Sequence, residues 1–419
     1  MNPNSVEHAH KFDRQRVAHR LALLPFALFL IVLPFPGTVA LRLLCLIAAA
    51  GVAFAYWWQH PEDRPAIPCK AAWGAWIVIV VASLAYSVDP AYSLGEIKNE
   101  LGYAMLAFLS FFTVGRDKET IVFLSQALLL GFAIIGIWGL LAWFDNARNW
   151  VDGGGYGGVG VFSTYIVTIL PVLLFLVLRP GTHMPRLFAA VLLVFALLLT
   201  GLVTQRATWL VLLLQGIAGV LLLARKSDWL LTRRQIILTL LALVALGSGA
   251  FLVSLLQRGG GTMDSASEHV MADPRIRNWP AMIDRVVDHP LAGAGYGRQI
   301  MRKAYPDLVP KDATSLWHPH NIFLGYGLGM GFPGILAFAA LFYCLGRVFW
   351  QKLSAGGDRE DRLLAICGIL LVAGVLARNQ FNDFFVRDMA LLFWSLAGLF
   401  LGYVARRQAA RPHPVALNT

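Results

Sequence analysis

The hydrophobic residues of this chain stand in long uninterrupted blocks rather than in short alternating runs. Each block is roughly 17–25 residues long, which as an α-helix matches a hydrocarbon core about 30 Å thick. Inside lipid a segment must satisfy its own backbone hydrogen bonds, so the blocks predict membrane-spanning helices. We expect about twelve spans, at residues 21–36, 39–58, 71–87, 99–114, 120–144, 161–178, 187–204, 207–224, 235–256, 321–346, 363–378 and 389–404.

The composition agrees with this all-α, multi-pass membrane fold. Of the 419 residues, 58% are hydrophobic and 14% are charged, whereas a soluble domain is about 45–50% apolar and about 25% charged. The first block follows a short basic segment, as in a signal peptide, but no small-residue cleavage site comes after it. We therefore expect a retained helix. The net charge of +11 lies in loops beside membrane spans, so we expect no nucleic-acid partner.

The lysines and arginines orient the spans. With the N-terminus in the cytoplasm, 21 of them fall in the tails and cytoplasmic loops and 13 on the opposite side, 8 of these in the long segment 257–320. Long loops cross the membrane largely regardless of charge, so the short loops decide the orientation. We expect nine helices within 1–256, an outer loop at 257–320, three helices within 321–404 and a cytoplasmic tail at 405–419.

The long outer loop carries helix and turn signals. Asp273 is suited to cap a helix that Pro274 opens, and His289-Pro290 is suited to end it. We expect short helices in this loop, with a glycine-rich turn at 293–297. Its basic residues either form a solvated face near lipid headgroups or hold an anionic substrate, because the guanidinium fork binds phosphate oxygens in pairs.

One arginine lies at the turn between the seventh and eighth spans. Arg206 follows Gln205 in LLLTGLVTQRATWLVLLLQG, close to the hydrocarbon region. Such an arginine is costly unless its side chain reaches the interface or faces a polar cavity. Both interpretations stay open: a side chain extended to the membrane surface, or an anion site at the outer mouth of the bundle.

The stretch SLWHPHNIFLGYGLGMGFPG, residues 315–334, begins the tenth span. Asn321 is suited to cap the helix that starts at Ile322, and Gly331-Phe332-Pro333 predicts a break in it. His318 and His320 lie at the outer boundary of the membrane. They could bond loop carbonyls or bind a metal, although no third ligand is evident in the sequence. They could also act as a general base, because an imidazole accepts a proton near neutral pH.

Three segments together resemble a known family. WHPHNIFLGYGLGMGFPGIL resembles the His-Asn motif of the O-antigen ligase and polymerase superfamily. RIRNWPAMIDRVVDHPLAGAGYG resembles its segment of spaced Arg, Trp, Pro and Gly-x-Gly, with Arg275 four residues before Trp279. TQRATWL resembles its periplasmic arginine turn, with Gln205 where a serine is common. The resemblance covers roughly Leu199 to Leu336.

The resemblance implies a glycosyltransferase of the Gram-negative inner membrane with its active site facing the periplasm. The donor would be a glycan on undecaprenyl pyrophosphate, and the acceptor a hydroxyl of the lipid A–core. A polymerase of the same superfamily is the second interpretation, and a lipid-linked glycan transporter or flippase the third. We expect no cofactor and no metal, because no acidic pair suited to one is evident on the outer side.

The expected site residues follow from the same motifs. His320 occupies the family's His-Asn position and is the expected base, with His318 beside it. The pyrophosphate would be held by Arg206, Arg275 and, as a weaker candidate, Arg277. Supporting roles are expected for Gln205, Trp279 and Asn321.

Overall fold

The computed structural model describes residues 19–146, 150, 158–181, 183–203, 205–225, 232–258, 273–309, 318–383, 385 and 387–409. Within these ranges the chain is helical and contains no β-strand. The helices are α2 (Leu24–Val32), α3 (Val39–Gln59), α4 (Lys70–Ala82), α5 (Pro90–Glu96), α6 (Tyr103–Val114), α7 (Lys118–Asp145), α8 (Val159–Leu178), α9 (His183–Val203), α10 (Arg206–Ala224), α11 (Arg233–Arg258), α13 (Pro274–Asp288), α14 (Ile300–Ala304), α15 (Ile322–Ser354), α16 (Arg359–Arg378) and α17 (Arg387–Ala409).

Each of the twelve expected spans coincides with a helix, although several boundaries differ. Among the described residues, 8 helices are long and apolar enough to cross a membrane, and the count of twelve stays a prediction. Helix α2 is only 9 residues long. Helix α6 begins at Tyr103 rather than 99, after a π-helical turn over Ile97–Gly102, and α15 runs on to Ser354. The membrane character of the chain is therefore secure, while the number of crossings is not fixed by helix length.

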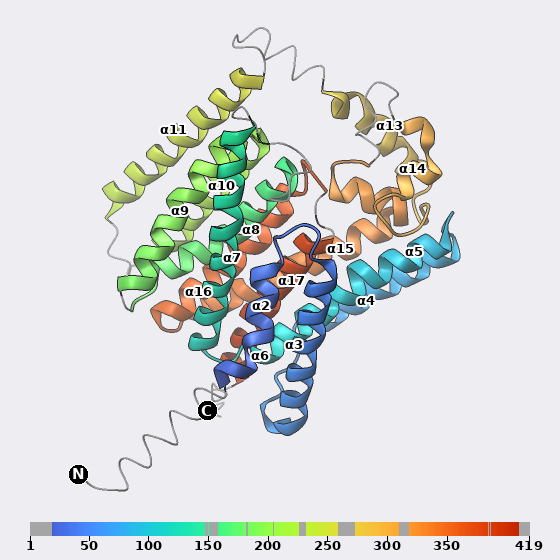
Figure 1. The fold of residues 1–419 in the computed structure, drawn as a ribbon. Helices are drawn as coiled ribbons and strands as arrows, with labels where there is room; N and C mark the ends of the chain where they lie inside the picture. Colours follow the sequence, from blue (N-terminus) through green and yellow to red (C-terminus); the bar gives the residue numbers. More distant parts are fainter. Residues whose placement is uncertain are drawn as a thin grey trace, which may run out of the picture.

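The helices form a bundle whose centre and rim differ in burial (Figure 1). Helices α8 and α17 are almost enclosed by their neighbours, whereas α11 lies at the rim with its apolar side chains exposed. Helix α17 packs closely along α6, because Gly398 and Gly402 leave no room for a side chain beside the carbonyls of Phe108 and Phe112. Small residues allow this close approach inside a membrane.

Ion pairs gather at one end of the bundle. Asp63, before α4, pairs with Arg116 after α6 and with Arg406 near the end of α17. Lys352 at the end of α15 pairs with Asp361 at the start of α16. These residues belong to the loops and tail that the sequence assigns to the cytoplasm, so we call this end the inner end.

Helices α13 and α14 lie at the opposite end, against the first half of α15 (Figure 1). We call it the outer end. Helix α15 is broken where the sequence predicts, since Gly331 has φ 65° and ψ −163°. The break exposes the Phe332 amide, which donates to the Pro290 carbonyl at 2.8 Å. The amides of Ala294 and Gly295 donate in turn to the carbonyls of Leu328 and Gly329. The glycines of α15 thus let the outer segment dock directly on its backbone.

Candidate active site

The His318–His320 segment is held from two sides at the outer end. The indole Nε1 of Trp279, on α13, donates to the Pro319 carbonyl at 2.8 Å. Asn321 caps α15 as expected, because its Oδ1 accepts the amides of Phe323 and Leu324. His320 has φ 54°, a left-handed conformation that is uncommon for a residue other than glycine. Strained backbone of this kind persists where its surroundings fix it, often at functional sites.

His320 presents one free ring nitrogen. Its Nδ1 lies 2.7 Å from Oδ1 of Asn382, and because an amide oxygen can only accept, Nδ1 carries the proton. Its Nε2 is buried and has no hydrogen-bond partner among the described residues. Burial, and next the electrostatic effect of His318, lower the pKa of His320 from 6.5 to about 4. The ring is therefore neutral at pH 7, with its Nε2 lone pair available to accept a proton.

His318 is tied at both ring nitrogens. Its side chain is 4% exposed, and its Nδ1 lies 2.6 Å from a carboxylate oxygen of Asp383. Its Nε2 lies 3.0 Å from the guanidinium of Arg298, which can only donate. The two histidine rings lie 3.9 Å apart between centroids. His318 is thus placed to orient the neighbouring ring, whereas His320 keeps an available lone pair.

Asp383 is the residue that sequence reasoning missed. It lies in the short connection between α16 and α17 and also pairs with Arg298 at 3.3 Å. Burial alone would raise its pKa, but the hydrogen bond from His318 and the nearby positive charge of Arg298 lower the pKa to about 2. Asp383 is therefore ionised. The polar run NQFND between two apolar spans, residues 379–383, was the available signal.

One cation could be coordinated by the side chains of His318, His320 and Asp383 together. Their potential ligand atoms lie within 4.8 Å of one another, so Asp383 supplies the third ligand that the sequence did not reveal. The Arg298 guanidinium, however, bonds both His318 and Asp383 and already places a positive charge in this cluster. The other ring nitrogen of His320, Nδ1, is hydrogen-bonded to Asn382. These contacts fit a hydrogen-bonded cluster better than a metal centre.

The expected arginines are only partly brought together. Arg275, near the start of α13, bonds Asp273 and the Phe381 carbonyl, and its charge acts electrostatically on His320. Gln205, directly before Arg206, accepts a hydrogen bond from Arg378 at 2.7 Å. Among the described residues the Arg206 side chain makes no hydrogen bond or ion pair. The side chain of Arg277 lies outside the described residues.

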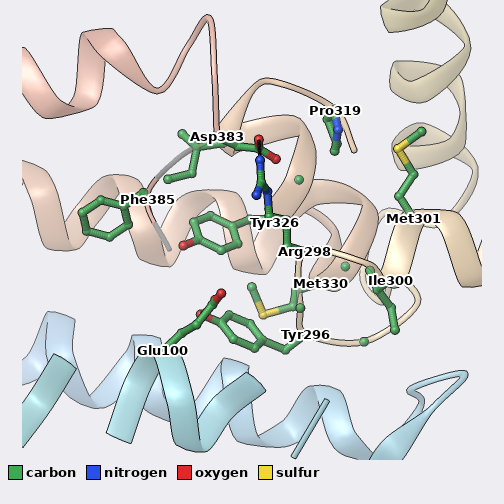
Figure 2. A pocket seen from close by; sticks show the side chains of 15 residues that line it. Glu100, Tyr296, Arg298, Ile300, Met301, Pro319, Tyr326, Met330, Asp383 and Phe385 are labelled. Carbon is green, nitrogen blue, oxygen red and sulfur yellow. Dashed lines mark hydrogen bonds and ion pairs between the residues drawn. The ribbon is translucent and has the colours of Figure 1, made fainter. Parts of the chain in front are cut away.

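A pocket lies beside this cluster (Figure 2). Arg298 and Asp383 lie on one side of it and Glu100 and Tyr296 on the other, with Tyr326 between them. The Tyr296 hydroxyl donates to the buried Glu100 carboxyl at 3.0 Å. The cavity volume is about 40 Å³, which accommodates a few water molecules and no sugar ring. A glycan would therefore have to lie on the outer surface or find a more open form of the protein.

Comparison with known proteins finds a match, and it overlaps most of the candidate site. No curated protein matches the chain. Residues 188–339 match the family model described as O-antigen ligase (Wzy_C). The matched segment includes α13, the arginine turn at the start of α10 and the His318–Asn321 segment, whereas Asn382 and Asp383 of the cluster lie outside it. Residues 188–339 therefore resemble an O-antigen ligase domain, which supports the resemblance of the chain to the O-antigen ligase superfamily.

Proposed function

We propose that this protein transfers an O-antigen glycan from undecaprenyl pyrophosphate to a hydroxyl of the lipid A–core. The main support is that His320 is neutral and that its Nε2 has no partner among the described residues, inside the segment that matches the O-antigen ligase family. A base of this kind contributes about 10²–10⁴-fold to a rate when it takes a proton in the transition state.

The proposed reaction is a single displacement. The acceptor hydroxyl oxygen bonds to the anomeric carbon of the glycan while its proton passes to His320 Nε2. The bond from the anomeric carbon to the phosphate oxygen breaks, and its electron pair stays on the phosphate. The products are the glycosylated lipid A–core and undecaprenyl pyrophosphate. Attack from the face opposite the leaving group inverts the anomeric centre.

Arginines take the role of stabilising the leaving group. Arg206 and Arg275 are the proposed pyrophosphate ligands, with Arg277 as a weaker candidate. Arg275 has the better structural support, because its charge already acts on His320. Fixed positive groups stabilise charge that develops on a leaving oxygen without reorganising during the reaction. Together with Arg298 in the histidine cluster, they favour transfer that needs no metal.

The outer end is proposed to face the periplasm from the inner membrane. A cysteine-free variant with Leu291→Cys should react with a membrane-impermeant maleimide in intact spheroplasts, because Leu291 is 78% exposed at the outer end. Ser354→Cys at the inner end should react only after permeabilisation. The reverse pattern would contradict both the orientation and the mechanism.

The test of activity is reconstitution of the purified protein with lipid-linked glycan and lipid A–core. A ligase yields lipid A–core carrying the glycan and releases undecaprenyl pyrophosphate. Elongation of the lipid-linked glycan without use of lipid A–core would indicate the polymerase instead. Movement of the donor across the bilayer without a new glycosidic bond would indicate a flippase.

A further inference from the structure

Arg378 is a fully buried arginine at the outer end of the bundle. It is the last residue of α16, and its exposed fraction is 0%. The carbonyl oxygen of the next residue, Asn379, accepts the amide of Ile322 at 2.9 Å, so the backbone at Arg378 lies beside the start of α15, which follows the His318–His320 segment. It belongs neither to the three motifs nor to the segment that matches the family.

The guanidinium of Arg378 has few partners. Its Nη2 donates to Oε1 of Gln205 at 2.7 Å and reaches the Gly160 carbonyl at 3.5 Å. Its Nε and Nη1 are buried and have no hydrogen-bond partner in the part of the chain that the structure describes. Among the described residues no carboxylate pairs with it. Three N–H groups on Nε and Nη1 are therefore left to bind something else.

Such a charge is unfavourable in the protein alone. A buried cation loses its hydration, and only an opposite charge or complete hydrogen bonding compensates for that loss. Arg275 adds repulsion, because its positive charge acts on Arg378. The two are also linked by structure, since Arg275 Nη1 donates to the carbonyl of Phe381, three residues after Arg378. An anion bound beside both guanidiniums would compensate for burial and repulsion together.

We propose that Arg378 is the innermost ligand of the donor's pyrophosphate, oriented by Gln205 and approached past Arg275. This inference rests on the proposed function. Arg275 is paired with Asp273 and its side chain is 34% exposed, so water screens its attraction for an anion. Arg378 is fully buried and has no carboxylate partner among the residues described, so its attraction is screened far less. It is placed to stabilise the negative charge that remains on the phosphate when the glycosyl bond breaks.

The experiment measures thermal unfolding of the purified full-length chain in detergent, with farnesyl diphosphate as ligand and farnesol as the uncharged control. A ligand that binds the folded state raises the unfolding temperature in proportion to its affinity. The wild-type protein should be stabilised by farnesyl diphosphate and not by farnesol. Arg378→Met should unfold at the same or a higher temperature without ligand, and should bind farnesyl diphosphate at least tenfold more weakly.

A purely structural arginine behaves in the opposite way. If Arg378→Met unfolds at a lower temperature or fails to fold, or still binds farnesyl diphosphate as the wild type does, the proposal is overturned. Arg378→Lys is the second variant: it keeps the charge but loses the planar fork, so affinity should again fall at least tenfold. Unchanged affinity of Arg378→Lys would also count against the proposal.

The proposed function can be separated from this inference. If Arg275→Ala loses binding while Arg378→Met keeps it, only the role of Arg378 falls. If the wild-type protein binds no isoprenyl diphosphate at all, the donor itself is wrong, and both proposals fall with it.

Discussion

The two ends of the helical bundle treat buried charge in opposite ways. At the inner end, Lys352 lies 3.0 Å from Asp361, both side chains are buried, and the Tyr403 hydroxyl donates to the same carboxylate. At the outer end, His320 Nε2 and two nitrogens of Arg378 are buried and, within the described ranges, have no hydrogen-bond partner. Lys352 and Asp361 neutralise each other's charge at the inner end, whereas Arg378 at the outer end has no carboxylate partner among the described residues.

The difference separates structural residues from site residues. Buried polar atoms in folded proteins are nearly always hydrogen-bonded, because an unmade bond is costly. Exceptions that persist tend to lie at functional sites, where a ligand or a reacting group supplies the missing partner. The Lys352–Asp361 pair thus links α15 to α16, and the Tyr403 hydroxyl joins α17 to it. We propose that the donor and the acceptor supply the partners that the outer-end groups lack.

Removing one partner of the inner pair should have the largest effect on stability. Lys352→Met leaves the Asp361 carboxylate buried without its cation, which typically costs about 3–5 kcal/mol. Addition of Asp361→Asn should recover most of that loss, because no unpaired charge then remains. Unfolding in detergent against denaturant measures both variants. A loss of less than about 1 kcal/mol in the single variant would remove the contrast between the two ends.

Changing an arginine at the outer end should instead affect ligand binding. Arg275→Lys retains the charge but loses paired hydrogen bonds, each worth about 1.5–3 kcal/mol when charged. Donor affinity should fall about 10–100-fold with little change in the unfolding temperature. Arg285→Lys is the matched control on the same helix, because Arg285 pairs with Asp307 at the surface. Equal loss in both variants would indicate a general effect of charge geometry on α13.

The low pKa of His320 should move the acid limb of the kcat/KM profile to lower pH. The base works only when neutral, and it gains a proton as the pH falls through its pKa of about 4. The kcat/KM should therefore stay level from pH 8 to about 5 and fall below that, tenfold for each pH unit well below the pKa. An acid limb centred near pH 6.5 would mean that the ring is less buried than described.

Chelation of divalent metal ions should not change the rate of transfer. The proposed ligands of the leaving group are arginines, and Arg298 already occupies the histidine cluster. Turnover should be unchanged in EDTA. If EDTA abolishes transfer and one divalent ion restores it, then a metal ion is bound by His318, His320 and Asp383. The metal ion would then be the missing partner of the outer-end groups.

Local signals in the sequence predicted the local structure of the site. Asn321 caps α15, Asp273 caps α13, and α15 breaks at Gly331, because each depends on neighbours a few residues away. The partners of the histidines could not be predicted in the same way. Asn382 lies 62 residues from His320, and only the packing of α15 against α16 brings the α16–α17 connection to the histidines. The free nitrogens of Arg378 were equally hidden, since a sequence does not show which arginine lacks a carboxylate.

The most direct test is the turnover of His320→Ala and His318→Ala in the reconstituted transfer reaction, at matched protein levels and saturating donor. His289→Ala is the control, an exposed histidine at the end of α13. We predict that His320→Ala still binds farnesyl diphosphate but loses about 10²–10⁴-fold in rate. His318→Ala should lose less, and His289→Ala should match the wild type. An active His320→Ala beside an inactive His318→Ala would contradict the account, because the base would then be the ring whose two nitrogens are already engaged.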